Sequence, residues 1–414
     1  MGINMNTKKL NILLLNNTKY NPAYPARTEI IEIFGGIFPK LGHKITWICP
    51  SNINHIVKTE FNEVDLYIVP SIPYYVLKYF FIKGFNIISH SLKKINLIYN
   101  LIRTSNIDII QTRDNIFDSI IALIIKKRKK IPFVFQINFI QLETNLDYDN
   151  NSILLRLYKN ITKLILKYIL KKADLILPIS EYMRNYLILK KLNESKIITM
   201  PMGVNYKTFF PNNGIEDFKN KFNLEGNIIY IYVGTMVKKR NLYVIIRAFF
   251  LVKKDIENVK LLMVGDGDCK EELEKISSKL NLEEDIIFTG KVSYSEIPKY
   301  ICLADIGLSP IVPTDNYIMS SPTKVLEYLA CGIPVVGNRE ILDMKDTIKK
   351  SKGGILVDFN AESFAEGMKI LARNGQINKK MGEEGRKWVI NNRSYIEIAN
   401  KLEKKYYKLL SEKS

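Results

Sequence analysis

The feature that most constrains this chain is a repeated alternation of short apolar runs with amphipathic helical stretches. In the first half, apolar runs of strand length occupy residues 10–17, 43–50, 65–70, 107–112, 132–137 and 173–180. Helical patterns separate most of them, as in Glu29–Leu41 and Ile116–Lys127. Short apolar strands that alternate with helices are typical of a parallel sheet covered on both faces. The first half therefore predicts a doubly wound α/β domain.

The same alternation starts again after Gly203. The strand-like runs of the second series are residues 228–234, 259–267, 285–290, 304–310, 333–338 and 353–358. Between the two series, Met200–Gly214 loses periodicity and is rich in Pro, Gly and Asn, as linkers are. A chain of 414 residues is too long for one ordinary domain. We predict two α/β domains, at residues 1–205 and 206–387, and a closing helical segment at residues 388–414.

Glycine-rich turns follow several strands of the second series, at Gly234-Thr235, at Gly265-Asp266-Gly267 and at Gly290. Ligands of parallel sheets bind at the carboxyl ends of the strands, so these turns are candidate ligand loops. Ordinary turn chemistry explains any single one of them equally well. The Gly-Asp-Gly turn lacks the complete G-x-G-x-x-G dinucleotide fingerprint and gives no indication of NAD.

The stretch "SSPTKVLEYLACGIPVVGN" (Ser320–Asn338) combines a polar loop, a helix that ends at Gly332 and a buried strand. Its one acid in the first helical turns is Glu327, just after Thr323 and Lys324. A helix N-terminus presents unpaired N–H groups and a positive dipole end, which suit a phosphate. The alternative is a well-capped core helix in which Glu327 only complements the dipole.

The chain carries a formal charge of +19, and most of it lies in the first half. Residues 1–205 hold 28 Lys and Arg against 14 Asp and Glu, which accounts for +14. A basic half can serve nucleic acid, an anionic membrane surface or anionic substrates, and solvated surface lysines explain it too. Because no helix-turn-helix, zinc finger or aromatic RNA-binding pattern occurs, nucleic acid is not expected as a partner.

The four cysteines lie far apart, without a C-x-x-C pair or a histidine cluster, so we predict neither a disulfide framework nor a metal site. No uncharged apolar run reaches the ~18 residues of a membrane-spanning helix. The apolar run near the start has no cleavage site, which favours a strand over a signal peptide. These features predict a cytoplasmic protein.

Several motifs in order resemble the nucleotide-sugar glycosyltransferases known as family 4 or group 1. They are "VGTMVKKRNLYVIIRAF", "LLMVGDGDCKEELEKISSKLNLEEDIIFTGKVSYSEIPKYICLADIGLSPI" and "SPTKVLEYLACGIPVV", preceded by "ADLILPISEYMRNYL" and "KIITMPMGVNYKTFFPN". The resemblance covers essentially the whole chain and is most specific in the second half. It implies the GT-B fold, in which two Rossmann-like domains face each other and a final helix crosses back to the first domain.

The resemblance also implies an activity. Such enzymes move a sugar from a UDP- or GDP-sugar to a glycan or lipid-linked acceptor. It implies retention of the anomeric configuration, catalysis without a metal and no cofactor besides the nucleotide-sugar co-substrate. A nucleotide-sugar epimerase of related fold and a non-enzymatic basic nucleic-acid binder remain as alternatives.

The family pattern assigns roles residue by residue. The acid at Glu327 would hydrogen-bond the donor ribose, and Arg240 and Lys324 would be the catalytic cations that stabilise the leaving diphosphate. The other donor-binding candidates are Gly234, Thr235, Lys239, Gly265, Val292, Ser321, Pro322, Thr323 and Val325. On the acceptor side the candidates are Arg27, Arg113 and Asn138.

The chain departs from the family pattern at several of these places. Met319 stands where relatives usually carry a second glutamate, and Thr235 replaces a basic residue. Asn138 stands in place of a frequent histidine, and the first loop has Arg27 instead of twin glycines. Sugar recognition and the acceptor side are therefore left open. His43, in a turn motif of the family, is predicted to have a structural role.

Two stretches of the first half are both basic and amphipathic, Asn151–Leu175 and Tyr74–Arg103. Packing of these helices on the first sheet, with their lysines in water, explains the periodicity. The alternative is that one or both lie on an anionic membrane and bring the active site to a lipid-linked acceptor. That alternative would place the protein at the inner face of the cell membrane.

Overall fold

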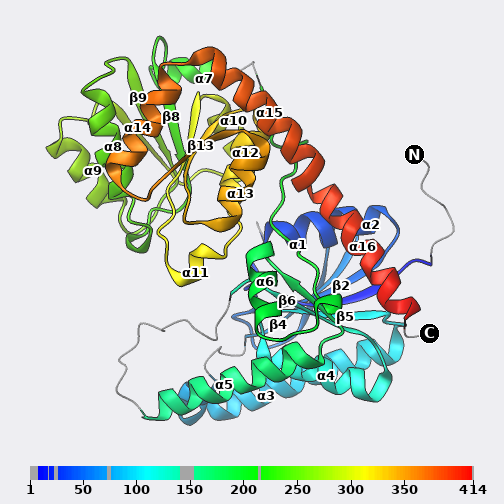
Figure 1. Cartoon of the computed structure of the whole chain (residues 1–414). Coiled ribbons are helices and arrows are strands. Elements are labelled where there is room, and N and C mark those ends of the chain that lie inside the picture. The colour runs from blue at the N-terminus through cyan, green and yellow to red at the C-terminus, as the bar shows by residue number, and fades with distance from the viewer. Residues whose placement is uncertain are drawn as a thin grey trace. The chain divides into compact units, whose positions relative to one another are not determined.

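The computed structural model describes residues 8–16, 18–22, 27–71, 76–139, 153–212 and 216–412. The chain forms two compact units, Met1–Met200 with Ile398–Ser414, and Pro201–Glu397 (Figure 1). Each unit contains one sheet of mainly parallel strands. The predicted class, two α/β domains with parallel sheets, is confirmed. The first change of unit falls inside the predicted linker, and the last helix joins the first unit, as the resemblance implied.

The first unit builds its sheet from short apolar segments. Its strands are β1 (Asn11–Leu15), β2 (Lys44–Ser51), β3 (Val57–Phe61), β4 (Val64–Pro70), β5 (Ile109–Arg113), β6 (Phe133–Ile137) and β7 (Leu175–Pro178). Its helices are α1 (Thr28–Glu32), the π-helical turn η1 (Ile33–Ile37), α2 (Phe38–Lys40), α3 (Val76–Thr104), α4 (Ile116–Lys129), α5 (Ile153–Lys172), α6 (Glu181–Leu189), η2 (Glu194–Lys196) and α16 (Tyr395–Ser411).

The strand order of this sheet is β3-β4-β2-β1-β5-β6-β7, and every pair is parallel except β3 with β4. The edge strand β3 was not predicted. Its side chains alternate between half-buried and exposed because only one face of this edge strand is covered. The apolar run that the other strands share is the mark of strands buried on both faces.

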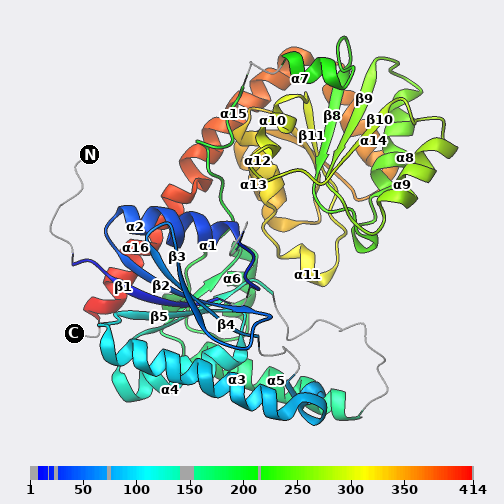
Figure 2. The same ribbon diagram turned by 180° about the vertical axis from the view of Figure 1, so that it is seen from behind.

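Helices cover both faces of the first sheet. In Figures 1 and 2, α3, α4 and α5 lie side by side on one face, and α1, α2 and α16 lie on the other. The Tyr406 hydroxyl on α16 donates to Gln111 on β5. His43 accepts the Leu10 amide through Nδ1 at 3.1 Å, and its Nε2 lies 2.8 Å from Glu403 on α16. His43 therefore has the predicted structural role, joining the final helix to the first sheet.

The second unit repeats the plan. Its strands are β8 (Ile228–Val233), β9 (Val259–Val264), β10 (Ile286–Gly290), β11 (Ile306–Ser309), β12 (Val335–Asn338) and β13 (Gly354–Val357). Its helices are α7 (Glu216–Lys221), η3 (Lys238–Arg240), α8 (Tyr243–Lys253), α9 (Lys270–Lys279), α10 (Ile297–Cys302), α11 (Asp315–Ile318), α12 (Thr323–Ala330), α13 (Leu342–Ser351), α14 (Ala361–Ala372) and α15 (Gly375–Arg393).

The strand order β10-β9-β8-β11-β12-β13 is that of a Rossmann-like sheet, and every pair is parallel. One core layer packs α8, α9 and α14 on one face, and a second packs α10, α12, α13 and α15 on the other. Helix α12 is buried along nearly its whole length, including Lys324 and Glu327. The fold thus takes two ionisable side chains of α12 out of water.

No helix among the described residues is both long enough and apolar enough to span a bilayer.

Candidate functional site

The second sheet has its switch point between β8 and β11, adjacent strands whose following helices lie on opposite faces. Ligands of such folds bind at the carboxyl ends of the strands here. Pairing of β8 with β11 ends at Ile231 and Gly307. Beyond it, the Val233 amide donates to Tyr328 Oη at 2.8 Å, and that hydroxyl lies 3.4 Å from the Leu308 carbonyl oxygen. The opening between the two strands is therefore closed by α12.

Two glycines shape the rim of the switch point. The φ of Gly265 is +137°, and a Cβ there would meet the Gly234 carbonyl oxygen at 2.1 Å. At Gly234 a Cβ would lie 3.1 Å from Arg240 Nη1 and 3.3 Å from Lys324 Nζ. A side chain at Gly265 would push the ends of β8 and β9 apart. The absence of a side chain at Gly234 lets the cationic groups of Arg240 and Lys324 lie close to the backbone at the end of β8.

The buried ring of Tyr232 on β8 orients both cations. Arg240 Nη1 donates to Tyr232 Oη at 3.3 Å, and Lys324 Nζ lies 4.1 Å from the centroid of the same ring. The hydroxyl itself donates to the Thr235 carbonyl oxygen at 3.2 Å. Burial raises the pKa of the Tyr232 hydroxyl, although Arg240 opposes the shift, so the ring stays neutral at physiological pH.

Lys324 is buried, and its Nζ has no hydrogen-bond partner among the described residues. Burial lowers the pKa of this ammonium group well below its ordinary value, and nearby Arg240 lowers it further, while Glu327 opposes the shift. A buried amine without an acceptor is costly unless a partner arrives. An anion placed beside Lys324 and Arg240 would supply that partner and raise the pKa of Lys324 again.

Glu327 lies one helical turn after Lys324 on α12. Burial raises the pKa of its carboxyl to about 7, against the opposing effects of Lys324 and of the Tyr294 hydroxyl. That hydroxyl lies 3.5 Å from Glu327 Oε1. The carboxyl is therefore balanced between its two protonation states near neutral pH.

The loop before α12 presents backbone groups to this region. Pro322 occupies the N-cap, and no side chain caps the first turn, which begins at Thr323. The Ser321 hydroxyl points elsewhere, into a buried network with Asp343. The first-turn N–H groups are available for an anion.

The remaining donor-side candidates differ in exposure. Thr235 and Lys239 are exposed on the loop after β8, and Val292 is half-buried against the core beside α12. The Val325 side chain lies inside that core, so only its backbone is free to serve a ligand. Met319 is half-buried and ends α11.

The first unit brings a second polar cluster to the carboxyl ends of β5 and β6. Arg113 is buried and pairs with Glu29 of α1 at 2.9 Å, and Arg113 Nε has no hydrogen-bond partner among the described residues. Asp114, with φ +47°, accepts the backbone and side-chain amides of Asn138, both at 2.8 Å. Burial raises the pKa of Asp114, against Arg113 and Asn138. Arg27 is exposed at the start of α1.

Sequence reasoning missed Tyr232, Tyr294, Glu29 and Asp114. A signal existed for Asp114, because a charged Arg-Asp pair follows the strand "IIQT" directly. No local pattern distinguishes Tyr232 from an ordinary core aromatic residue. Its role depends on Arg240 and Lys324, which come from two other elements.

A face of α5 is apolar and exposed at the same time. Leu157, Ile161, Leu164 and Tyr168 are 55%, 41%, 69% and 57% exposed and share one side of the helix. We call these four residues the α5 stripe. Exposed basic side chains accompany it, at Arg156, Lys163, Lys167, Lys171 and Lys172. The packed side of α5 is formed by other residues, Leu166, Ile169 and Leu170. Packing on the sheet therefore leaves the α5 stripe unexplained.

Two family models match the chain. Residues 214–388 match glycosyl transferases group 1, and residues 38–207 match glycosyltransferase family 4. The two matches fall one in each half of the chain.

Curated relatives are distant in sequence. An uncharacterised glycosyltransferase of Methanocaldococcus jannaschii is 25% identical over 328 residues, which cover 76% of this chain and 78% of the relative. A GDP-mannose-dependent alpha-(1-6)-phosphatidylinositol monomannoside mannosyltransferase of Mycolicibacterium smegmatis is 23% identical over 56% of this chain and 62% of its own length. An alpha-monoglucosyldiacylglycerol synthase of Streptococcus pneumoniae is 24% identical over 65% of this chain and 58% of its own length.

Solved structures share the fold. Sucrose-phosphate synthase from Thermosynechococcus elongatus superposes with a TM-score of 0.72 at 17% identity, covering 97% of this chain and 100% of that one. The Anabaena protein HepE in complex with UDP gives a TM-score of 0.71 at 12% identity, covering 96% and 100%.

Proposed function

We propose, from the premise that the chain belongs to the group 1 (family 4) glycosyltransferases, that it transfers a hexose from a UDP- or GDP-sugar to a lipid-linked or glycan acceptor. One observation carries the donor half of the proposal. The Lys324 amine is buried without a hydrogen-bond partner in the described structure and lies with Arg240 around a bare glycine, at the strand ends where such folds bind nucleotides. This arrangement suits a diphosphate.

The donor roles follow from the chemistry of each group. The diphosphate binds beside Gly234, where Arg240 and Lys324 face it and the first-turn N–H groups of α12 add hydrogen bonds. The phosphate charge would stabilise the ammonium form of Lys324 and offset its desolvation. Glu327, in its ionised form, accepts hydrogen bonds from the ribose hydroxyls. Exposed Lys239 adds charge at the entrance.

The transfer step needs stabilisation of the leaving nucleoside diphosphate. Arg240 and Lys324 supply it by holding positive charge where negative charge develops. We propose that no metal is needed for this, and no cofactor besides the nucleotide sugar. Retention of the anomeric configuration, by a same-face displacement that the leaving phosphate assists, is proposed from the family resemblance.

The acceptor is proposed to bind at the polar cluster of the first unit. Arg113 and Asn138 at the ends of β5 and β6 offer hydrogen-bond groups for a hydroxylated acceptor, and Arg27 lies two residues before Glu29, the ion-pair partner of Arg113. A lipid-linked acceptor is supported by the names of two relatives, a phosphatidylinositol monomannoside mannosyltransferase and a monoglucosyldiacylglycerol synthase. Family membership favours a transferase over the epimerase and the nucleic-acid binder.

A panel of UDP- and GDP-sugars, incubated with lipid and glycan extracts and read by mass spectrometry, tests the proposal. Transfer of one sugar to one acceptor class, with release of the matching nucleoside diphosphate, is the expected result. Conversion of a donor into its epimer would favour the epimerase. If the protein binds neither UDP nor GDP, the proposal is wrong.

We further propose that the α5 stripe rests on an anionic membrane and that the protein works in the cytoplasm at the inner face of the cell membrane. Transfer of exposed apolar side chains from water into the membrane interface is favourable. Each nearby Lys or Arg adds about 1 kcal/mol of binding free energy on anionic lipid. The α5 stripe provides the apolar contribution and its basic neighbours provide the electrostatic one, both on a single helix. A protein held there would meet lipid-linked acceptors directly.

Flotation with vesicles tests the membrane surface. We expect binding to vesicles that contain anionic lipid at low salt, release at high salt and weak binding to neutral vesicles. The variant Leu157→Gln/Leu164→Gln should bind several-fold less, whereas Leu189→Gln, at an exposed leucine of α6, should bind like the wild type. Absence of binding to anionic vesicles at low salt would mean that the membrane-surface proposal is wrong.

A further inference from the structure

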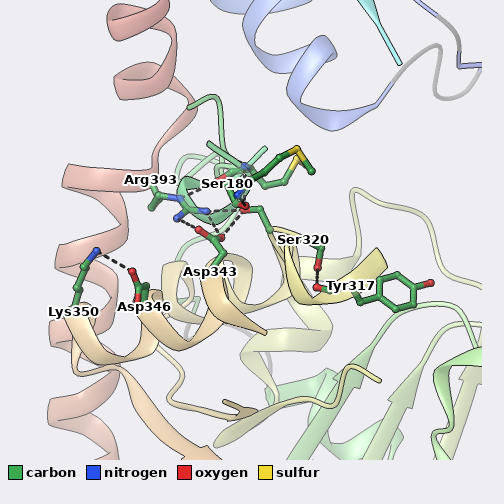
Figure 3. A network of polar contacts seen from close by, with 10 residues as sticks. Ser180, Tyr317, Ser320, Asp343, Asp346, Lys350 and Arg393 are labelled. Atoms are coloured by element: carbon green, nitrogen blue, oxygen red, sulfur yellow. Dashed lines mark hydrogen bonds and ion pairs between the residues drawn. The ribbon is translucent and has the colours of Figure 1, made fainter. Parts of the chain in front are cut away.

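A buried polar network, which we call the Arg393 cluster, lies beside the loop that opens α12 (Figure 3). Arg393, the last residue of α15, donates from Nη1 to Asp343 Oδ1 at 3.1 Å and from Nη2 to Asp343 Oδ2 at 2.8 Å. The same Nη2 donates to Ser321 Oγ at 2.7 Å, and Nε donates to the Met202 carbonyl oxygen at 3.0 Å. One guanidinium group therefore joins three separate parts of the second unit.

Burial of this charged cluster costs desolvation free energy. Arg393, Asp343 and Ser321 are only 8%, 7% and 6% exposed. A buried ion pair loses about as much in desolvation as it gains in attraction, so apolar residues would serve stability equally well. The bidentate geometry instead fixes the position and orientation of the Asp343 carboxylate relative to the Arg393 guanidinium group. The cluster therefore contributes mainly by fixing the positions of the residues that it joins.

Ser321 is the member that touches the candidate site. Its hydroxyl donates to Asp343 Oδ2 at 2.7 Å and accepts from the Met202 amide at 3.2 Å as well as from Arg393. A hydroxyl has one hydrogen and two lone pairs, so all of its hydrogen bonds are used. Ser321 directly precedes Pro322, the N-cap of α12. The cluster thereby fixes the backbone from which the first-turn N–H groups point.

Two further members, Met202 and Arg393, lie where the chain enters and leaves the second unit. Met202 is near its first residue, Pro201, and Arg393 is near its last, Glu397. These two segments also pair with each other. The Val204 amide donates to the Arg393 carbonyl oxygen at 2.9 Å, and the Tyr395 amide donates to the Val204 carbonyl oxygen at 3.2 Å.

We propose that Arg393 and Asp343 are positioning residues for the donor loop Ser320–Thr323, holding its N–H groups toward the diphosphate by anchoring Ser321 to the Met202–Val204 segment. Neither residue touches the substrate. The inference rests on the proposed function, because it assumes that this loop binds the diphosphate of a nucleotide sugar. Groups that hold a binding loop in its productive geometry affect affinity without contacting the ligand.

Calorimetric titration with UDP, GDP, UMP and GMP tests the inference in the full chain. In Arg393→Ala and Asp343→Asn we expect the affinity for the preferred diphosphate to fall about tenfold, the equivalent of one lost hydrogen bond. Monophosphate affinity should fall less, because the loop serves the diphosphate. Arg393→Lys, which keeps the charge, should recover part of the loss. Lys350→Ala, an exposed residue of α13 that pairs with Asp346, is the matched control and should bind like the wild type.

Ser321→Ala keeps the test valid if Arg393→Ala does not fold, since it removes only one hydroxyl. Hydrogen exchange gives a second readout. Nucleotide binding should slow exchange of the Val204 and Tyr395 amides in the wild type, and this effect should disappear in Ser321→Ala. A purely structural cluster would lower the melting temperature and leave both readouts unchanged, which would overturn the inference alone. Failure of the wild type to bind either diphosphate would overturn the proposed function and the inference together.

Discussion

Arg240→Ala should slow sugar transfer roughly 30- to 10³-fold, a loss of about 2 to 4 kcal/mol of transition-state stabilisation. The reason lies in the position of its guanidinium group, which hydrogen-bonds Tyr232 and lies close to Gly234 at the end of β8. Under the proposed function, negative charge would develop there as the nucleoside diphosphate leaves. Initial rates at saturating donor measure the effect, and the affinity for the free nucleotide should change much less.

Lys239→Ala is the matched control for Arg240. Lys239 is the preceding residue and carries the same charge, but its side chain is exposed to water. Solvent screens an exposed charge, so its removal should slow transfer only a few-fold. Equal effects of the two substitutions would mean that Arg240 contributes only general positive charge and does not act on the leaving group.

Glu327→Gln should weaken nucleotide binding by one to two orders of magnitude. A carboxylate that accepts from two ribose hydroxyls loses charge-assisted hydrogen bonds worth about 1.5 to 3 kcal/mol when it becomes an amide. Gln keeps the size of the side chain, so α12 should stay packed and the melting temperature should change little. Titration calorimetry with UDP and GDP measures the affinity.

The pH dependence gives the same residue a second test. Burial raises the pKa of the Glu327 carboxyl to about 7, so in the free protein it is mostly protonated at pH 6 and mostly ionised at pH 8. Only the ionised form accepts from both hydroxyls. The wild-type affinity should therefore fall as the pH is lowered from 8 to 6, approaching tenfold per unit below pH 7.

Nucleotide phosphates also titrate near pH 6, so the informative quantity is the difference between the wild type and Glu327→Gln. Tyr294→Phe sharpens the test. The Tyr294 hydroxyl lowers the pKa of Glu327, so its removal should move the midpoint of the wild-type profile to higher pH. Identical profiles in the wild type and Glu327→Gln would exclude Glu327 from nucleotide binding.

The sequence by itself determined where most strands lie. Of the strands in the described parts of the chain, all but β3 overlap a predicted run. A strand buried on both faces must be apolar throughout, and that composition is visible locally. The edge strand β3 (VKTEF) is covered on one face only, and its charged residues hide it from a search for apolar runs. Its alternating pattern was the available signal.

The sequence also located the helix that carries Glu327 and the glycine turns around it. Motif order and spacing are local properties, and the family pattern fixes them along the chain. Tertiary structure alone decided what the ionisable groups do. Within the described parts of the chain Lys324 has no acceptor, and the pKa of Glu327 is raised to about 7, because residues from β8, η3 and the loop after β10 pack around α12 and exclude water.

The long-range polar contacts were the features that the sequence could least predict. Arg393 lies 72 residues from Ser321 and 191 residues from Met202, and no periodicity links such positions. In the first unit, Glu29 and Arg113 meet only because α1 begins at the edge of the sheet where β5 ends. Apolar patterns specify which segments become strands and helices, since burial depends on composition. Which polar groups meet depends on the geometry with which those segments pack, and only the folded chain fixes that geometry.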